Sequence, residues 1–201
     1  MTPRRISFTT FMDFVTATGA SKLSRIRQAQ SIYGAPEYRL ADYYLDFKHA
    51  VTKCFDGAGF SALDACFSAL EDGRKRPHYR TLITGMKKWV GRKQFESSFT
   101  LQANDWVSSD LAVSVRPELG LIYKGERLII KLYCKDEALD QHRINPLLHL
   151  LRATHGALGT VAILDVRRAK LFKITREVKG IDAFLAAEAQ SFVSLWNSLA
   201  A

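Results

Sequence analysis

The hydrophobic period of this sequence changes once, near residue 95, and the change limits the folds that the chain can adopt. Before that point, apolar residues recur at steps of three and four, as on the buried face of an amphipathic helix. After it, short runs such as Leu111–Val115 and Arg127–Tyr133 have the length and composition of strands. The two patterns predict an α+β protein, in which a helical N-terminal half packs on a mixed β-sheet with flanking helices in the C-terminal half.

Capping residues and glycines divide the first half into five expected helices. The third should carry an apolar stripe from Leu40 to Cys54, and the fifth a stripe from Tyr79 to Val90. The residues that mark the five helix starts are Thr9 or Thr10, Ser21, Pro36, Ser61 and Pro77.

The second half is expected to contain strands and two helices. The runs on either side of Lys124-Gly125-Glu126 predict a β-hairpin. Asn145 and Pro146 predict a helix start, because Asn caps helices and Pro at the first helical position loses no hydrogen bond. A last helix is expected from about Ile181 to Leu199. The expected strands are residues 99–101, 111–115, 119–123, 127–133, 161–164 and 170–174.

The length of 201 residues allows one substantial hydrophobic core, and no Pro/Ser-rich linker divides the chain. We expect a single domain over 1–201, with a helical subdomain at about 1–94 and an α/β subdomain at about 95–201. No apolar run approaches the roughly 20 residues that span a bilayer, so no membrane partner is expected. Three cysteines without metal-ligand spacing favour a reducing, cytoplasmic location.

Motifs of cofactor-dependent and metal-dependent enzymes are missing from the sequence. It has no glycine-rich nucleotide loop, no nucleophile elbow and no H-E-x-x-H pair, and its five histidines lack ligand spacing. We therefore expect no cofactor and no metal.

The basic residues are distributed unevenly along the chain. The net charge is +9, and such an excess favours acidic partners, of which nucleic acid is the commonest. Between Gly73 and Phe95 there are eight basic residues and no acidic one. A solvated helix usually mixes charge signs, because opposite charges four residues apart stabilise it. The predicted nucleic-acid-binding residues, called the basic ridge below, are Arg74, Lys75, Arg76, Arg80, Lys87, Lys88, Arg92 and Lys93.

The basic ridge has two further interpretations. An acidic protein partner would supply the missing negative charge as phosphates do. Alternatively, acids from elsewhere in the fold would neutralise a ridge that is only a solvated face. A second acid-free stretch, residues 15–36, contains Lys22, Arg25 and Arg27 after Asp13.

Two segments of the second half support a family resemblance. Arg116-Pro117-Glu118-Leu119-Gly120-Leu121 places a proline and an acid just before the expected hairpin, and Glu126–Tyr133 supplies its second strand. With the following helix and strand, the order over about residues 97–175 resembles the core of the PD-(D/E)XK nucleases, a restriction-endonuclease-like fold.

The resemblance implies a catalytic pattern that this sequence does not keep. Such nucleases hold Mg²⁺ between two carboxylates, with a lysine two residues beyond the second. Glu118 matches the first acid, but Lys131 stands at the second acid and Tyr133 at the lysine. Because a cation cannot hold a divalent metal, the resemblance implies a degenerate, inactive site.

Two further carboxylates have both functional and structural interpretations. Asp165 follows the expected buried strand 161–164, where functional acids often lie, or else it bonds the turn at Arg167-Arg168. Glu188 falls within the apolar arc of the last helix, where a carboxylate needs a partner, and a structural ion pair is expected.

The sequence thus favours a non-catalytic nucleic-acid-binding protein that uses the basic ridge. A metal-dependent nuclease or another enzyme with an unrecognised site is the first alternative, and its catalytic residues would be Glu118, Lys131 and Asp165. A protein-interaction module with an acidic partner is the second.

Overall fold

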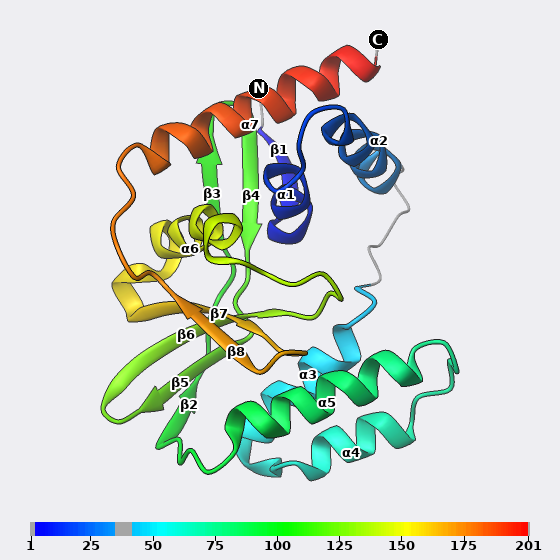
Figure 1. Ribbon diagram of the computed structural model, residues 1–201, viewed down its shortest axis with the longest axis vertical. Helices are drawn as coiled ribbons and strands as arrows, with labels where there is room; N and C mark the ends of the chain where they lie inside the picture. The colour runs from blue at the N-terminus through cyan, green and yellow to red at the C-terminus, as the bar shows by residue number, and fades with distance from the viewer. Residues whose placement is uncertain (1–2, 35–41, 201) are drawn as a thin grey trace.

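The computed structural model describes residues 3–34 and 42–200 and has an α+β fold, as expected (Figure 1). A five-stranded sheet has the order β2-β5-β6-β7-β8, and a three-stranded sheet has the order β1-β4-β3. The strands are β1 Arg4–Ser7, β2 Ser97–Phe99, β3 Asn104–Ser108, β4 Leu111–Val115, β5 Leu119–Tyr123, β6 Glu126–Tyr133, β7 Thr160–Asp165 and β8 Lys170–Lys173.

Seven α-helices are described, together with a π-helical turn and a 3₁₀ turn. No helix in the described parts of the chain is both long enough and apolar enough to cross a membrane. The helices are α1 Phe8–Val15, α2 Ser21–Tyr33, α3 Leu45–Lys53, α4 Ser61–Ser68, α5 Arg76–Val90, α6 Gln141–His155 and α7 Ile181–Ala200, with turns η1 Cys54–Ala58 and η2 Gly156–Leu158.

The centre of the five-stranded sheet is built from the predicted hairpin and one crossover. β5 and β6 pair antiparallel, and Tyr123 lies opposite Glu126, so the turn consists of Lys124 and Gly125 alone. Both turn residues have positive φ angles, 53° and 75°, as a two-residue type I′ hairpin requires. The chain then crosses through α6 to β7, which runs parallel to β6, and β8 pairs antiparallel with β7.

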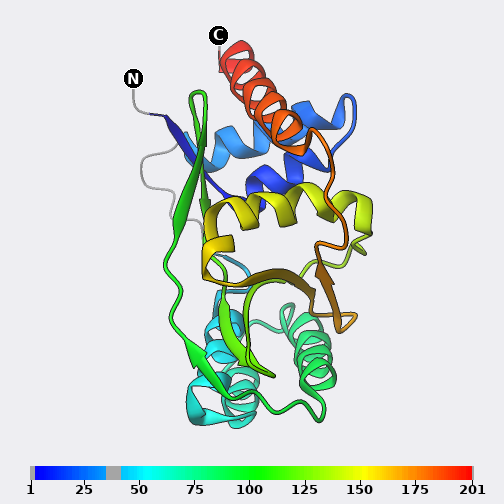
Figure 2. The same ribbon diagram turned by 90° about the vertical axis from the view of Figure 1, so that its left-hand side faces the viewer.

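Helices cover both faces of this sheet (Figure 2). Alternate residues of β6 face opposite ways, so Ile129 joins one hydrophobic cluster and Ile130 the other. The cluster of Ile129 contains α1, α2, α6, α7 and the smaller sheet, whereas that of Ile130 contains α3, α4 and α5. The helices of the first 94 residues are therefore divided between the two faces.

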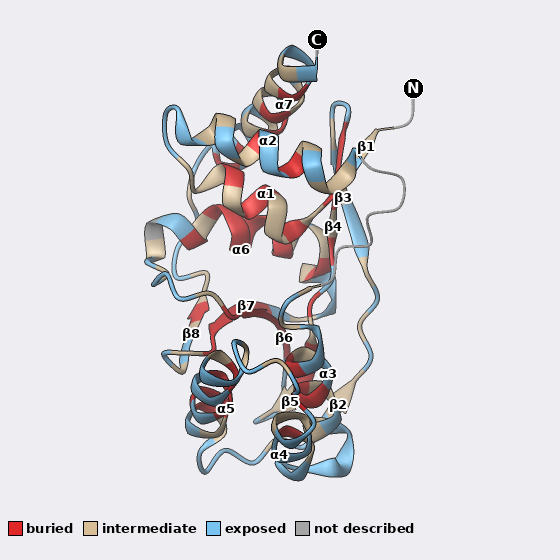
Figure 3. Ribbon diagram, turned by 90° about the vertical axis from the view of Figure 1, so that its right-hand side faces the viewer, coloured by how far each residue is buried: buried red, intermediate tan, exposed pale blue. Residues whose placement is uncertain are grey.

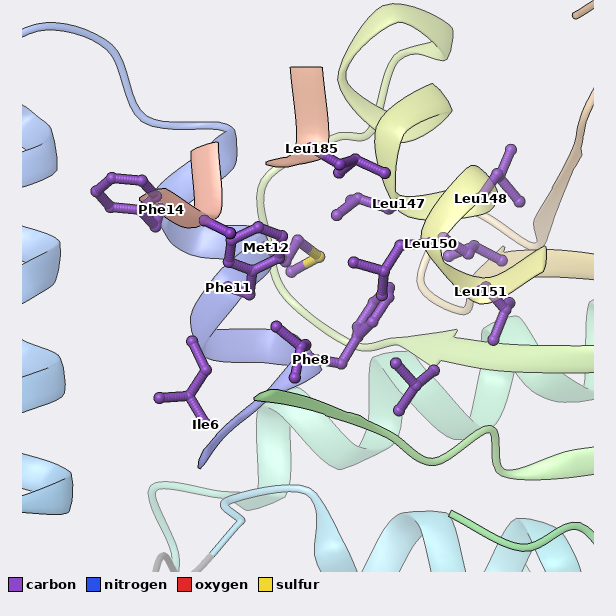
Figure 4. Close-up of a cluster of buried hydrophobic side chains, with 14 of the residues drawn as sticks. Ile6, Phe8, Phe11, Met12, Phe14, Leu147, Leu148, Leu150, Leu151 and Leu185 are labelled. Carbon is purple, nitrogen blue, oxygen red and sulfur yellow. The ribbon is translucent and has the colours of Figure 1, made fainter. Parts of the chain in front are cut away.

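The cluster of Ile129 is the larger one, and α1 and α6 meet at its centre. Phe8, Phe11 and Met12 of α1 face Leu147 and Leu150 of α6 (Figure 4). α1 contains only buried and intermediate residues, and α6 is mostly buried (Figure 3).

An ion pair joins α2 to α7 at the edge of this cluster. The Lys22 ammonium lies 2.7 Å and 2.5 Å from the two carboxylate oxygens of Glu188. Their side chains are 20% and 14% exposed, so the pair is partly buried. The expected structural partner of Glu188 is confirmed, and it comes from the second acid-free stretch.

Two strands were not predicted, and both lie at edges of the smaller sheet. β1 runs parallel to β4, and β3 pairs antiparallel with β4 on its other side. In β1 only Ile6 is buried, and β3 is mostly polar. Neither segment has a clear apolar alternation, because an edge strand needs few buried side chains.

Several predicted helix starts were also wrong. α1 is capped by Ser7, whose side-chain oxygen accepts a hydrogen bond from the Thr10 amide, and not by Thr9 or Thr10. Ser21 is the first residue of α2, and its hydroxyl donates to the Thr18 carbonyl. α3 begins at Leu45, and the expected start at Pro36 lies outside the described residues.

The start of α6 has a different cap from the one expected. The Asp140 carboxylate accepts a hydrogen bond from the Arg143 amide at 2.8 Å, so the helix begins at Gln141. Pro146 consequently lies inside the helix. The side chain of Asn145 accepts a hydrogen bond from that of Gln141 and does not cap the helix.

Replacing Gly85 by Ala should destabilise the fold. A Cβ atom at Gly85 would lie 1.9 Å from the Val166 carbonyl oxygen, so α5 would have to move away from the end of β7. We expect a loss of about 1–3 kcal/mol in the free energy of unfolding, measured by chemical denaturation. Gly73→Ala is the matched control, because no heavy atom lies within 4 Å of its Cβ position. Equal stability of the two variants would contradict the close packing of α5.

Candidate functional site

A cleft of about 1080 Å³ opens between the N-terminal helices and the five-stranded sheet. Its walls come from α1, α2, the start of α3, the segment before β5 and the end of β6. In Figure 1 these elements surround the centre of the molecule, with α1 and α2 above and α3 below. The cleft contains Glu118 and Lys131 but not Asp165.

Glu118 contacts two lysines and a backbone amide inside the cleft. Its Oε1 atom lies 2.5 Å from the Lys131 ammonium and 3.2 Å from the Lys48 ammonium. Its Oε2 atom accepts a hydrogen bond from the Leu132 amide at 2.8 Å. The sheet register brings the pair together, because Leu119 lies opposite Ile130 and so places Glu118 beside Lys131. Both side chains are only 10% exposed.

A second carboxylate completes the cluster. Asp42 accepts from the Lys48 ammonium at 2.7 Å and from the Tyr44 amide at 2.9 Å. The Lys131 ammonium also donates to the Arg116 carbonyl at 2.8 Å. Two ammonium groups and two carboxylates thus form a cluster with no net charge.

Burial and mutual attraction shift the pKa values of this cluster in opposite directions. Burial lowers the pKa of Lys131 below its usual value, although Glu118 opposes the shift. Burial also opposes the charge on Lys48, but the nearby charge of Glu118 and the hydrogen bond to Asp42 outweigh it and raise the pKa of Lys48. For Asp42, burial is outweighed by the hydrogen bond and charge of Lys48, which lower its pKa.

Two other groups that line the cleft, a hydroxyl and a thiol, are not activated. Burial raises the pKa of the Tyr133 hydroxyl and of the Cys134 thiol to about 12 each. A thiol that stays protonated is a poor nucleophile. The Tyr133 hydroxyl therefore carries no charge near neutral pH.

The cleft offers little to a divalent metal ion. Among residues 3–34 and 42–200, no group of three or more His, Cys, Asp or Glu side chains could hold one. The carboxylates of the cluster, Glu118 and Asp42, already accept from ammonium and amide groups. Mg²⁺ and Ca²⁺ need several oxygen ligands, which this cluster does not provide as folded.

Asp165 serves the turn after β7. Its side chain is fully buried and accepts from the Arg168 amide at 3.2 Å and from the Arg168 guanidinium at 3.1 Å. Of the three candidate catalytic residues, Glu118 and Lys131 therefore meet in the cleft, and Asp165 has the structural role that was the alternative.

The basic ridge lies on α5 and the segments beside it. The predicted apolar stripe is buried, including Tyr79, Leu82, Ile83, Met86 and Trp89, and the basic residues lie outside it.

Four residues of the ridge already have ion-pair or hydrogen-bond partners within the protein. Lys87 pairs with Asp64 of α4 at 2.7 Å, and Arg74 pairs with Asp72 at 3.4 Å. Arg76 donates to the Leu70 carbonyl at 2.8 Å, and Lys93 donates to the Trp89 carbonyl. Asp72 lies only two residues before Arg74, whereas the packing of α4 brings Asp64 to the ridge.

Three further residues of the ridge are open to solvent. Arg80, Lys88 and Arg92 are exposed, and within the described residues they have no acidic partner. The second acid-free stretch does not add to them, because α2 and α5 lie at opposite ends of the molecule (Figure 1). Lys22 of that stretch is occupied by Glu188.

Sequence reasoning did not find the residues that join the ridge to the cleft. Tyr43 lines the cleft, its ring lies 5.1 Å from the Lys75 ammonium, and its hydroxyl is 3.5 Å from the Arg74 carbonyl oxygen. Lys48 and Asp42 were not found either. No local pattern marks these residues, because their contacts with Glu118 and with α5 depend on the packing of α3.

The chain was compared with family models, curated proteins and solved structures, and no match was found in any of the three.

Replacing Glu118 by Ala should destabilise the protein by about 3–5 kcal/mol, because it leaves the buried Lys131 ammonium without its carboxylate. The double variant Glu118→Leu with Lys131→Met should recover most of the loss, since it removes both charges. Glu126→Ala is the control, because Glu126 is 67% exposed and its replacement should change the free energy of unfolding by less than about 1 kcal/mol. A Glu118→Ala protein as stable as the control, by urea denaturation, would contradict this role.

Proposed function

We propose that this chain is a non-catalytic nucleic-acid-binding protein whose basic ridge contacts phosphates. The observation that carries the proposal is the exposure of Arg80, Lys88 and Arg92 along α5 and its C-terminal end, without an acidic partner in the described structure. Phosphates supply the negative charge that the helix lacks, and each neutralised phosphate releases counterions.

The packing of α5 favours phosphates over an anionic membrane. A membrane-surface helix buries its apolar face in the lipid. In α5 that face is already used, because Leu82, Met86 and Trp89 are buried in the protein core. Only the cationic side of the helix is left for a partner.

We also propose that the core is a degenerate PD-(D/E)XK core. The order β2, β5, β6, α6 and β7 supports this, with an antiparallel hairpin followed by a helical crossover to a parallel strand. So does the contact between Glu118 and Lys131, at the two positions that correspond to the family's acids. The pairing neutralises Glu118, which favours binding without metal-dependent cleavage.

The first test measures how nucleic-acid binding depends on salt. Lys88→Glu with Arg92→Glu should weaken binding of DNA or RNA and flatten the plot of log affinity against log salt by about 2, roughly one for each lost phosphate contact. Fluorescence anisotropy with labelled oligonucleotides measures both quantities.

The matched control for this test is Arg27→Glu with Arg176→Glu. Both residues are exposed and lie outside α5, Arg27 on α2 and Arg176 between β8 and α7, and the double variant changes the net charge by the same amount. Poly-glutamate serves as a competitor that represents an acidic protein. Equal effects of the two double variants would contradict the ridge, and displacement by poly-glutamate at the potency of RNA would favour an acidic protein partner.

The second test concerns catalysis. Wild-type protein incubated with labelled single- and double-stranded DNA and RNA, in Mg²⁺ or Mn²⁺, should give no cleavage, because Lys131 and Lys48 occupy the Oε1 atom of Glu118. Product is measured by denaturing gel electrophoresis. Cleavage that disappears in Glu118→Ala, in protein shown to be folded, would instead establish the enzyme alternative.

A further inference from the structure

The wall of the cleft nearest to the basic ridge carries accessible aromatic and apolar side chains. Tyr43 is 37% exposed and Leu45 is 43% exposed, and both line the cleft. Large apolar side chains at this exposure are few in the described structure, yet these two are separated by a single residue. Tyr44, between them, lines the cleft too and is partly exposed.

The ring of Tyr43 is held in place from several sides. Tyr44 meets it edge-on with ring centres 4.9 Å apart, and His78 of α5 does the same at 5.9 Å. The Tyr79 hydroxyl donates to the Tyr43 carbonyl at 3.0 Å and fixes the backbone. An exposed aromatic ring on a fixed backbone loses little conformational entropy when a planar group stacks on it.

Two basic residues of the ridge lie beside this ring. The Lys75 ammonium lies 5.1 Å from its centre, and Arg74, whose side chain is 93% exposed, is adjacent in sequence to Lys75. Stacking aromatics beside a basic surface are the combination by which proteins bind single-stranded nucleic acid.

We propose that the Tyr43–Leu45 wall is a stacking platform for unpaired bases, so that the protein prefers single-stranded nucleic acid to duplex. This inference rests on the proposed function, because the basic ridge supplies the phosphate contacts next to the platform. A duplex keeps its bases stacked on one another and cannot offer them to Tyr43. The cleft, at about 1080 Å³, is slightly larger than the range for small-ligand pockets, roughly 300–1,000 Å³, and suits a few unpaired nucleotides.

The test compares a single strand with a duplex of the same sequence. Tyr43→Ala should lower the affinity for single-stranded DNA roughly tenfold, the effect of losing one stacking partner, and leave duplex affinity unchanged. Tyr43→Phe keeps the ring and should bind as wild type does. A 2-aminopurine base in the strand should be quenched on binding to wild type and not on binding to Tyr43→Ala.

The matched control is Phe184→Ala, because Phe184 is 41% exposed on α7, away from the cleft. Equal affinity of Tyr43→Ala and this control for the single strand would contradict the stacking platform. The proposed function would still stand if Lys88→Glu with Arg92→Glu weakens binding. Equal losses on single strand and duplex would also overturn it. Wild-type protein that binds neither nucleic acid at low salt would overturn the proposed function itself.

Discussion

The Glu118 carboxylate is the interaction on which the arrangement of the cleft depends. It accepts from Lys131 on β6, from Lys48 on α3 and from the Leu132 amide. One side chain thereby ties the start of β5 to its neighbouring strand and fastens α3 to the same sheet. Because the group is nearly buried, its charge is tolerable only while both ammonium groups face it.

The contacts of Glu118 also determine the electrostatic character of the cleft. The charges of the two lysines and the two carboxylates cancel, so this cluster adds no net charge to the interior of the cleft. Open positive charge lies outside it, on Arg80, Lys88 and Arg92. Tyr43 lies between these regions, in contact with Lys75 on one side and lining the cleft on the other. The partner that we propose, a single-stranded nucleic acid, is anionic along its backbone and has aromatic bases, so it would use both regions.

Some of this molecule was predictable from the sequence, because the relevant signals are local. The stripe of α5 follows from the helical period, and the β5–β6 hairpin follows from two strand-like runs around Lys124 and Gly125. The partly buried ion pair of Glu188 follows from its place in the apolar arc of α7. Glu118 and Lys131, which the resemblance places at the two acid positions, meet in the structure because the short hairpin sets them opposite one another.

What could not be predicted depends on contacts between distant segments. The edge strands β1 and β3 bury few side chains, so their sequences lack a strand pattern. The start of α6 was misplaced because Asn145-Pro146 is a good start signal in isolation, while Asp140 makes the actual cap. Lys48 carries no mark in the sequence of its role beside Glu118, since the two are brought together only by the packing of α3 on the sheet.

The most direct measurement of the central claim is an NMR titration of the labelled protein with a single-stranded oligonucleotide. The backbone amide shifts should change along the exposed side of α5, between Arg80 and Arg92, and around Tyr43 to His49, while α7 stays unchanged. The changes should reverse as salt is added, because phosphate contacts are screened. Shifts confined to α2 or α7, or no shifts at low salt, would contradict the account.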